Sequence, residues 1–235
     1  MSLALARPDA VAPPAIESEF AFPTSDFDRV RKLIYQHAGI SLNPGKQAMV
    51  YSRLSRRLRE SNHRSFASYL QWLEQLDERD AEWQAFVNCL TTNLTSFFRE
   101  DHHFIALTQD LAARRGKPLA IWCNAASTGE EPYSIAMTVV EARGKDAAVS
   151  ALATDIDTQV LATAQRGVYD AAARGLSAER LKRHFLRGTG TKADAIRIRP
   201  GLARMIDFAP FGRHVGRRQR RRRSLRRLRA GVADQ

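Results

Sequence analysis

The sequence has little cysteine and no long apolar run, and both absences restrict what the protein can be. Only Cys89 and Cys123 occur among 235 residues, too few for a disulfide framework, so we expect free thiols in a reducing compartment. The start of the chain lacks a basic segment that leads into a continuous apolar stretch, which argues against a secretory signal peptide. No stretch approaches the roughly 18 apolar residues of a membrane span. The composition predicts a cytoplasmic protein without membrane insertion, and we expect it to be a monomer.

Excess positive charge is confined to one end of the chain. The formal net charge is +12, but residues 212–235 contain ten arginines and one aspartate, so +9 of it lies there. Clustered arginines can bind nucleic acid by neutralising phosphates. No other motif supports that function, so we expect no nucleic-acid partner. An Arg-tail nucleic-acid binder stays a remote alternative, which a steep salt dependence lost on deleting residues 212–235 would reveal.

The first part of the chain has the pattern of a small helical domain. Residues 1–23 are rich in Ala and Pro and predict a disordered leader. Residues 24–90 show helical periodicity, which predicts four helices. Ser25 or Asp26 is expected to cap the first of them, and Gly39 to end it.

Apolar stripes mark the inward faces of these helices. Val50, Leu54 and Leu58 recur at a spacing of four, so they should lie on one buried face of the second helix. The inward-facing residues expected on the fourth helix are Trp83, Phe86, Val87 and Leu90.

The pattern changes to alternating strands and helices in residues 91–211. PLAIWCNAA and AAVSALATDID read as strands, and each is followed by a helix, the second of these being TQVLATAQRGVY. Pro132 is expected at the first position of the first of these two helices. This order predicts a parallel sheet flanked by helices, which binds ligands at the carboxyl ends of its strands.

A third pattern follows, from about residue 185 to 209. A short helix, LSAERLKRHF, precedes the turn sequence RGTG and the alternating segments IRIR and MIDF. We expect these segments to form an antiparallel hairpin or three-stranded ribbon, inserted before the parallel sheet resumes.

Carboxylates stand where the two predicted parallel strands end. The loop before Glu130 and Glu131 has one glycine and no lysine, so it is not a phosphate-binding loop; for this pair alone, complementing the helix dipole is an equally good reading. Asp155 is placed to accept hydrogen bonds from ribose hydroxyls. Asp157 reads equally well as a helix cap. Together the loops indicate an adenosine-type ligand without phosphates, such as S-adenosylmethionine.

A polar loop, TNLTSFFRE, precedes the first of these strands. Asn93, Thr95 and Arg99 present polar groups, and the guanidinium could bind a ligand carboxylate through two parallel hydrogen bonds. His102 and His103 are adjacent, so they point to different sides of a helix, and we expect no metal site.

Four segments in this order, TNLTSFFRE, AASTGEEPYSIA, ATDIDTQVL and HFLRGTG, resemble the CheR family of chemotaxis receptor methyltransferases. The resemblance covers about residues 25–211. It implies an α/β fold: a small all-α domain, then a Rossmann-like methyltransferase domain with a small antiparallel β insertion. It also implies methyl transfer from S-adenosylmethionine to glutamate side chains of chemoreceptors, with S-adenosylhomocysteine as the second product.

The resemblance assigns roles to particular residues. Those that match cofactor-binding positions are Asn93, Thr95, Arg99, Glu131 and Asp155. Those on the helix that approaches the receptor are Arg53, Arg56, Arg57 and Arg59, which on sequence alone would read as solvated. In some family members the ribbon binds a receptor's C-terminal peptide by strand pairing. The chemistry implies neither a catalytic base nor a metal.

The resemblance ends after residue 211, where the Arg-rich segment replaces the family's N-L-L and F-D-A-I-F-C-R-N-V-M-I-Y-F segments. A frameshift near codon 212 is our hypothesis, because codons for Leu225–Arg229 can be chosen that read Phe-Asp-Ala-Phe when shifted by one base. A sheet without its remaining strands predicts an α/β domain of low stability with weak or absent activity, beside a helical domain that folds alone. The alternative function is then a receptor-binding remnant without catalysis.

Overall fold

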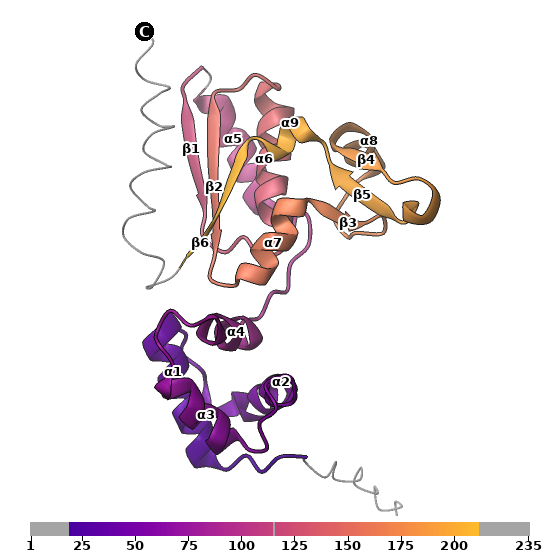
Figure 1. The fold of residues 1–235 in the computed structure, drawn as a ribbon. Coiled ribbons are helices and arrows are strands. Elements are labelled where there is room, and N and C mark those ends of the chain that lie inside the picture. The colour runs from indigo at the N-terminus through magenta and orange to yellow at the C-terminus, as the bar shows by residue number, and fades with distance from the viewer. Residues whose placement is uncertain (1–18, 115, 212–235) are drawn as a thin grey trace, which may run out of the picture.

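The computed structural model of this chain describes residues 19–114 and 116–211, which form a helical part and an α/β part joined by a short linker (Figure 1). In the described chain, four helices make up the helical part, as the periodicity predicted. They are α1 (Thr24–Ala38), α2 (Gln47–Glu60), α3 (Phe66–Gln75) and α4 (Ala81–Leu90), with the 3-10 turn η1 (Pro44–Lys46) before α2.

The two ends of α1 test the predicted helix signals. Gly39 ends the helix in a left-handed conformation, with φ 74°, and its N–H donates to the carbonyl of Tyr35, as expected. The predicted cap at Ser25 or Asp26 is wrong. The capping residue is Pro23, whose carbonyl accepts from the amides of Asp26 and Phe27 at 3.0 and 3.2 Å. Both predicted residues therefore lie in the first turn, where the Asp26 charge still complements the helix dipole.

The core of the helical part is apolar and includes one buried carboxylate. Val50, Leu54 and Leu58 are fully buried, which confirms the predicted stripe, and the predicted inward residues of α4 are buried as well. Glu82 is only 6% exposed; it accepts a hydrogen bond from the Tyr69 hydroxyl at 2.7 Å and is paired with Arg57. Such a buried carboxylate is stable only because both partners are present.

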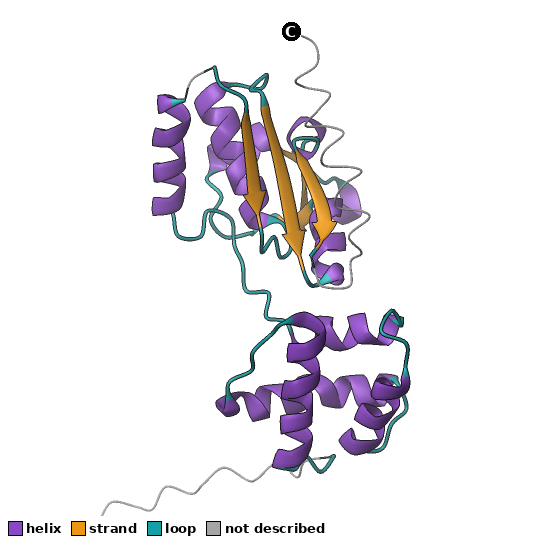
Figure 2. Ribbon diagram, turned by 90° about the vertical axis from the view of Figure 1, so that its left-hand side faces the viewer, coloured by secondary structure: helices purple, strands orange, loops and turns teal. Residues whose placement is uncertain are grey.

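The α/β part is built on a parallel sheet. Strands β1 (Leu119–Cys123), β2 (Val149–Asp155) and β6 (Ile206–Pro210) pair in the order β1-β2-β6. Helices α5 (His102–Ala113), α6 (Glu130–Arg143) and α7 (Thr158–Arg166) lie on one side of this sheet (Figures 1 and 2). The predicted βαβα order and its parallel pairing are confirmed.

The ribbon differs from its prediction in two strands. It consists of β3 (Val168–Asp170), β4 (Phe185–Arg187) and β5 (Ala195–Ile198), antiparallel in the order β3-β5-β4. The segment of β3 was read as the end of a helix, but Gly167, with φ 58°, ends α7 one residue earlier. The MIDF segment was placed in the ribbon, whereas it forms β6 of the parallel sheet, because its alternation does not encode which sheet it joins. We call residues 168–203, which include α8 (Ala178–His184), η2 (Gly190–Lys192) and α9 (Pro200–Ala203), the β subdomain.

The start of α6 also differs from its prediction. The helix begins at Glu130, so Pro132 is its third residue and not its first. Proline is accepted there because the first-turn amides have no intrahelical acceptor. Gly129 precedes the helix with φ 102°, and a Cβ atom at this position would lie 2.6 Å from the Tyr169 hydroxyl oxygen. Only glycine fits this turn, which brings the helix start close to the β subdomain.

Candidate cofactor site

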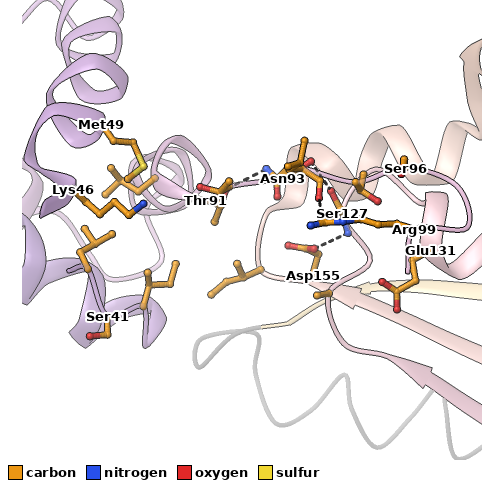
Figure 3. Close-up of a pocket in the computed structure, with 18 of the residues that line it drawn as sticks. Ser41, Lys46, Met49, Thr91, Asn93, Ser96, Arg99, Ser127, Glu131 and Asp155 are labelled. Atoms are coloured by element: carbon orange, nitrogen blue, oxygen red, sulfur yellow. Dashed lines mark hydrogen bonds between the residues drawn. The ribbon is translucent and has the colours of Figure 1, made fainter. Parts of the chain in front are cut away.

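A pocket of about 530 Å³ lies between the two parts, where β1 and β2 end (Figure 3). Its volume is in the range of small-molecule sites. The residues that line it include all five predicted cofactor-binding residues: Asn93, Thr95, Arg99, Glu131 and Asp155. They come from three separate segments, which the sheet topology brings together.

Asp155 is held rigidly at the end of β2. The residue is 7% exposed, and its two carboxylate oxygens accept hydrogen bonds from the amides of Ser127 and Asp157 at 2.7 and 2.9 Å. An ionised carboxylate has about four lone-pair sites, so both oxygens keep the capacity to accept from a ligand hydroxyl. The loops that follow β1 and β2 thus orient one acceptor toward the pocket.

Asp157 has a larger role than the helix cap the sequence suggested. It caps α7 as expected, since one of its oxygens accepts from the amides of Gln159 and Val160. Its other oxygen accepts from the Thr91 hydroxyl at 2.7 Å and from the Asn93 amide at 2.8 Å. Asp157 therefore holds both the linker that follows α4 and the start of the loop at residues 92–100, which we call the cofactor loop. The side-chain oxygen of Asn93 stays able to accept from a ligand.

Helix α4 docks on the same turn. The Gln84 amide donates to the carbonyl of Ile156 at 3.0 Å, and Asn88 exchanges hydrogen bonds with Thr158 at 3.2 and 3.3 Å. We call this set of contacts to residues 156–158 the interdomain clamp. No local pattern in the sequence predicts these contacts, because polar side chains on an amphipathic helix ordinarily face water.

The structure separates the two adjacent glutamates. Glu130 accepts from the Thr128 hydroxyl at 2.6 Å, whereas Glu131 lines the pocket. The thiol of Cys123 lies 3.8 Å from a Glu131 oxygen. Burial raises the pKa of Cys123 to about 12, and the charge of Glu131 adds to the effect, so the thiol stays protonated and can donate to the carboxylate.

Arg99 lies in a loop with unusual backbone angles. Its Nη1 donates to the carbonyl of Leu94 at 2.8 Å, which engages one of the five guanidinium N–H donors. The flanking residues Phe98 and Glu100 have φ values of 50° and 56°, in the left-handed region that side-chain-bearing residues rarely adopt. Contacts from neighbouring elements must therefore hold this loop.

The helical part supplies a wall that sequence reasoning missed. Ser41, Asn43, Lys46 and Met49 line the pocket opposite the strand ends (Figure 3). The loop before α2 is far from the cofactor motifs in sequence, and only the packing of the two parts brings it there. Lys46 adds a positive charge to this wall.

The four arginines of α2 differ in their surroundings. Arg53 donates to the carbonyls of Leu90 and Thr91, at 3.1 and 2.5 Å, and so contacts the linker. Arg57 is bound to Glu82. The exposed pair is Arg56 and Arg59, with side chains 75% and 55% exposed, which pair with Glu60 and Glu19.

Within residues 19–114 and 116–211, no group of three or more His, Cys, Asp or Glu side chains has an arrangement that could hold a metal ion. None of the helices in these two ranges combines the length and hydropathy that crossing a membrane requires.

A parallel sheet with a buried acid after its second strand, and with a second acid and an arginine around one pocket, fits the class of S-adenosylmethionine-dependent methyltransferases. Residues 93–214 match the family model described as CheR methyltransferase, SAM binding domain, and residues 25–91 match the CheR methyltransferase all-alpha domain. The chain therefore belongs to the CheR methyltransferase family, and S-adenosylmethionine is the methyl donor of its α/β domain.

Curated relatives support the same family. The chain is 48% identical over 193 residues to the chemotaxis protein methyltransferase of Escherichia coli K12, which covers 81% of this chain and 67% of the relative. It is 51% identical over 195 residues to chemotaxis protein methyltransferase 2 of Pseudomonas aeruginosa, covering 81% and 68%. For the Klebsiella aerogenes chemotaxis protein methyltransferase the values are 50% over 193 residues, 80% and 66%. The chain thus spans about two thirds of the length of these relatives.

The charges of the pocket fit S-adenosylmethionine. The cofactor has two positively charged groups, an amine and a sulfonium. It also has ribose hydroxyls and one carboxylate. The pocket offers a buried acceptor in Asp155, a second carboxylate in Glu131 and a guanidinium in Arg99. Two acids and one fork-shaped donor complement this ligand, whereas the two carboxylates would repel the phosphates of a nucleoside triphosphate.

Proposed function

We propose that this protein transfers the methyl group of S-adenosylmethionine to glutamate side chains of chemoreceptors, which yields methyl esters in the sensory adaptation of bacterial chemotaxis. The observation that carries the proposal is the convergence of the five cofactor-type residues on one pocket that opens between the two parts. The names of the relatives, all chemotaxis protein methyltransferases, support the receptor as acceptor.

In this proposal the protein binds and aligns, and it performs no proton transfer. The cofactor supplies an electrophilic methyl group on a positively charged sulfur. Asp155 accepts from the ribose hydroxyls, Arg99 binds the carboxylate of the ligand, and Glu131 faces its positive end. Asn93 and Thr95 complete the contacts along the linker.

The acceptor is a nucleophile as it arrives. A glutamate side chain has a reference pKa near ~4.3 and is ionised at neutral pH, so no general base is required. As the new C–O bond formed, the bond between the sulfonium sulfur and the methyl carbon would break, so the charges of both the carboxylate and the sulfonium would be neutralised and S-adenosylhomocysteine would be the leaving group. Alignment in a pocket shielded by the helical wall therefore provides most of the acceleration, worth up to ~7–11 kcal/mol in favourable cases.

The receptor is proposed to approach along α2. The chemoreceptor bundle is acidic, and the exposed Arg56 and Arg59 are the best placed of the four arginines to meet it. Arg53 and Arg57 have internal partners, so we expect them to support the surface more than to touch the receptor. In the described chain, β3 and β4 are the outer strands of the ribbon, and their edges suit the addition of a receptor peptide.

Calorimetric titration of the purified 235-residue chain with S-adenosylhomocysteine tests the proposal. We expect binding, and we expect Asp155→Ala to weaken it at least about tenfold, because charge-assisted hydrogen bonds to the ribose are lost. Asp146→Ala is the matched control, since this exposed aspartate lies in the turn before β2, away from the pocket.

Two results would overturn the proposal. Absence of binding by the soluble chain would leave the family name as a statement of ancestry, and receptor capture without methyl transfer would then select a receptor-binding protein. Equal binding by the parent and Asp155→Ala would show that the ligand occupies another site.

A further inference from the structure

The loop that carries Arg99 is strained and must be held from outside. Phe98 has a φ of 50°, and such a conformation persists only where surrounding contacts determine it. One of these contacts comes from α6, where the Ser134 hydroxyl accepts from the Phe98 amide at 3.0 Å. A single hydrogen bond fixes the backbone, but it leaves the direction of the neighbouring side chains open.

The β subdomain supplies several of the remaining contacts, beside Phe104 of α5, which packs edge-on against the Phe98 ring with the centroids 5.0 Å apart. The ring of Phe97 packs edge-on against Tyr169 of β3 and Phe185 of β4, with centroids 4.9 and 5.6 Å apart. Gly175 approaches so closely that a Cβ atom there would overlap the carbonyl oxygen of Phe97. The subdomain therefore packs against the side of the cofactor loop at Phe97 and contacts its backbone directly.

One charged side chain of the subdomain completes these contacts. The guanidinium of Arg180, on α8, lies over the ring of Phe98 at 3.6 Å from its centroid. Glu141 of α6 accepts two parallel hydrogen bonds from Arg180, at 3.0 and 2.9 Å, and contacts His184 at 3.1 Å. The planar guanidinium is thus fixed at one end and stacked at the other, a geometry that lysine cannot reproduce.

We propose that Arg180 is a positioning residue for cofactor binding: by stacking on Phe98 while Glu141 holds it, it orients the adjacent Arg99 toward the carboxylate of the ligand. This inference rests on the proposed function, in which Arg99 binds that carboxylate. Arg180 does not line the pocket itself, so its influence passes through Phe98. The β subdomain then contributes to cofactor affinity, in addition to any role in receptor binding.

The test compares two ligands on matched variants of the full chain. S-adenosylhomocysteine has the amino-acid carboxylate, whereas 5′-methylthioadenosine has the same nucleoside without it. We expect Arg180→Ala to raise the Kd of S-adenosylhomocysteine about tenfold, the scale of one cation–π contact and its ion pair, and to leave the Kd of methylthioadenosine within about twofold. Arg180→Lys should raise the Kd of S-adenosylhomocysteine as well, but by less than Arg180→Ala does. Arg183→Ala, on the same helix, should change neither value.

A double-mutant comparison identifies the route. Phe98→Leu removes the aromatic face, so adding Arg180→Ala to it should weaken binding little further. Melting of each unliganded variant checks that binding is measured on folded protein.

Three results would overturn the inference. They are an unchanged affinity for S-adenosylhomocysteine in Arg180→Ala, an equal loss for both ligands, and full additivity with Phe98→Leu. A parent chain that binds neither ligand would overturn the proposed function and this inference together. If the parent chain binds both ligands and Arg180→Ala binds them with the same affinities, the inference is overturned while the proposed function stands.

Discussion

The helical part and the α/β part bury their apolar side chains in different ways. In the helical part, all four helices contribute to one core, and most of its large side chains are fully buried. In the α/β part the core lies between the sheet and the helices on one side, whereas Trp122 of β1 is 58% exposed and Phe211, which follows β6, is 38% exposed. A helix bundle closes on itself, but a parallel sheet needs cover on both faces. The two parts should therefore differ in stability.

This difference in burial predicts that the two parts melt separately. In a calorimetric scan of the full chain we expect two transitions, with the α/β part melting first. Leu54→Ala should lower the free energy of unfolding of the helical part by about 2–5 kcal/mol and move only the second transition. Trp122→Ala should change stability by about 1 kcal/mol or less, because its side chain is already exposed. One cooperative transition shared by both parts would contradict this view.

Within the helical part, the adjacent arginines Arg56 and Arg57 also differ in burial. Arg57→Ala leaves the buried Glu82 without its ionic partner, so we expect a loss of about 2–4 kcal/mol. Arg56→Ala, with an exposed side chain, should change stability by less than about 0.5 kcal/mol and weaken receptor binding instead. Urea unfolding and receptor capture separate these outcomes. Equal stability of the two variants would show that Glu82 finds another partner or gives up its charge.

The smallest effect is a pH dependence confined to the α/β part. Burial lowers the pKa of His184, and this outweighs the opposite influence of Glu141. Burial alone would raise the pKa of Glu141, but Arg180 and His184 lower it overall. The charged residues beside His184 and Glu141 are Arg180 and Arg183.

The sign follows from proton binding. Because the unfolded state binds a proton to His184 more readily, stability from this group is complete above pH ~6.5 and declines as the pH falls toward the lower folded value. The contribution of Glu141 is lost only at lower pH, through its folded pKa. We expect the first melting transition to shift downward between pH 7 and about 5.5, and less so in His184→Gln. An equal shift in that variant would assign the dependence to other groups.

Local signals predicted much of this fold from the sequence. The buried stripe of α2, the end of α1 at Gly39 and the cap of α7 at Asp157 are set by neighbours within a few residues, so spacing and residue type suffice. The family motifs likewise named five side chains that converge on one pocket. The strand with which β6 pairs could not be predicted, because sheet membership depends on residues far away in the chain.

Long-range partners explain the remaining differences. Arg57 looked like its exposed neighbours, since nothing local shows that Glu82 is buried beside it. Lys46 and Met49 reach the pocket only through the packing of the two parts. Arg180 was one basic residue among several on a short helix, and its stacking on Phe98 needs the whole subdomain to be in place.

The interdomain clamp couples ligand binding in the pocket to the placement of the helical part. The turn at residues 155–158 orients Asp155, the proposed acceptor for the ribose, and also holds α4 and the linker. A ligand that favours one geometry of this turn must favour the matching placement of the helical part by the same free energy, because coupling between sites is reciprocal. Occupancy of the cofactor pocket and presentation of the α2 arginines are therefore thermodynamically linked, even though no arginine of that helix lines the pocket.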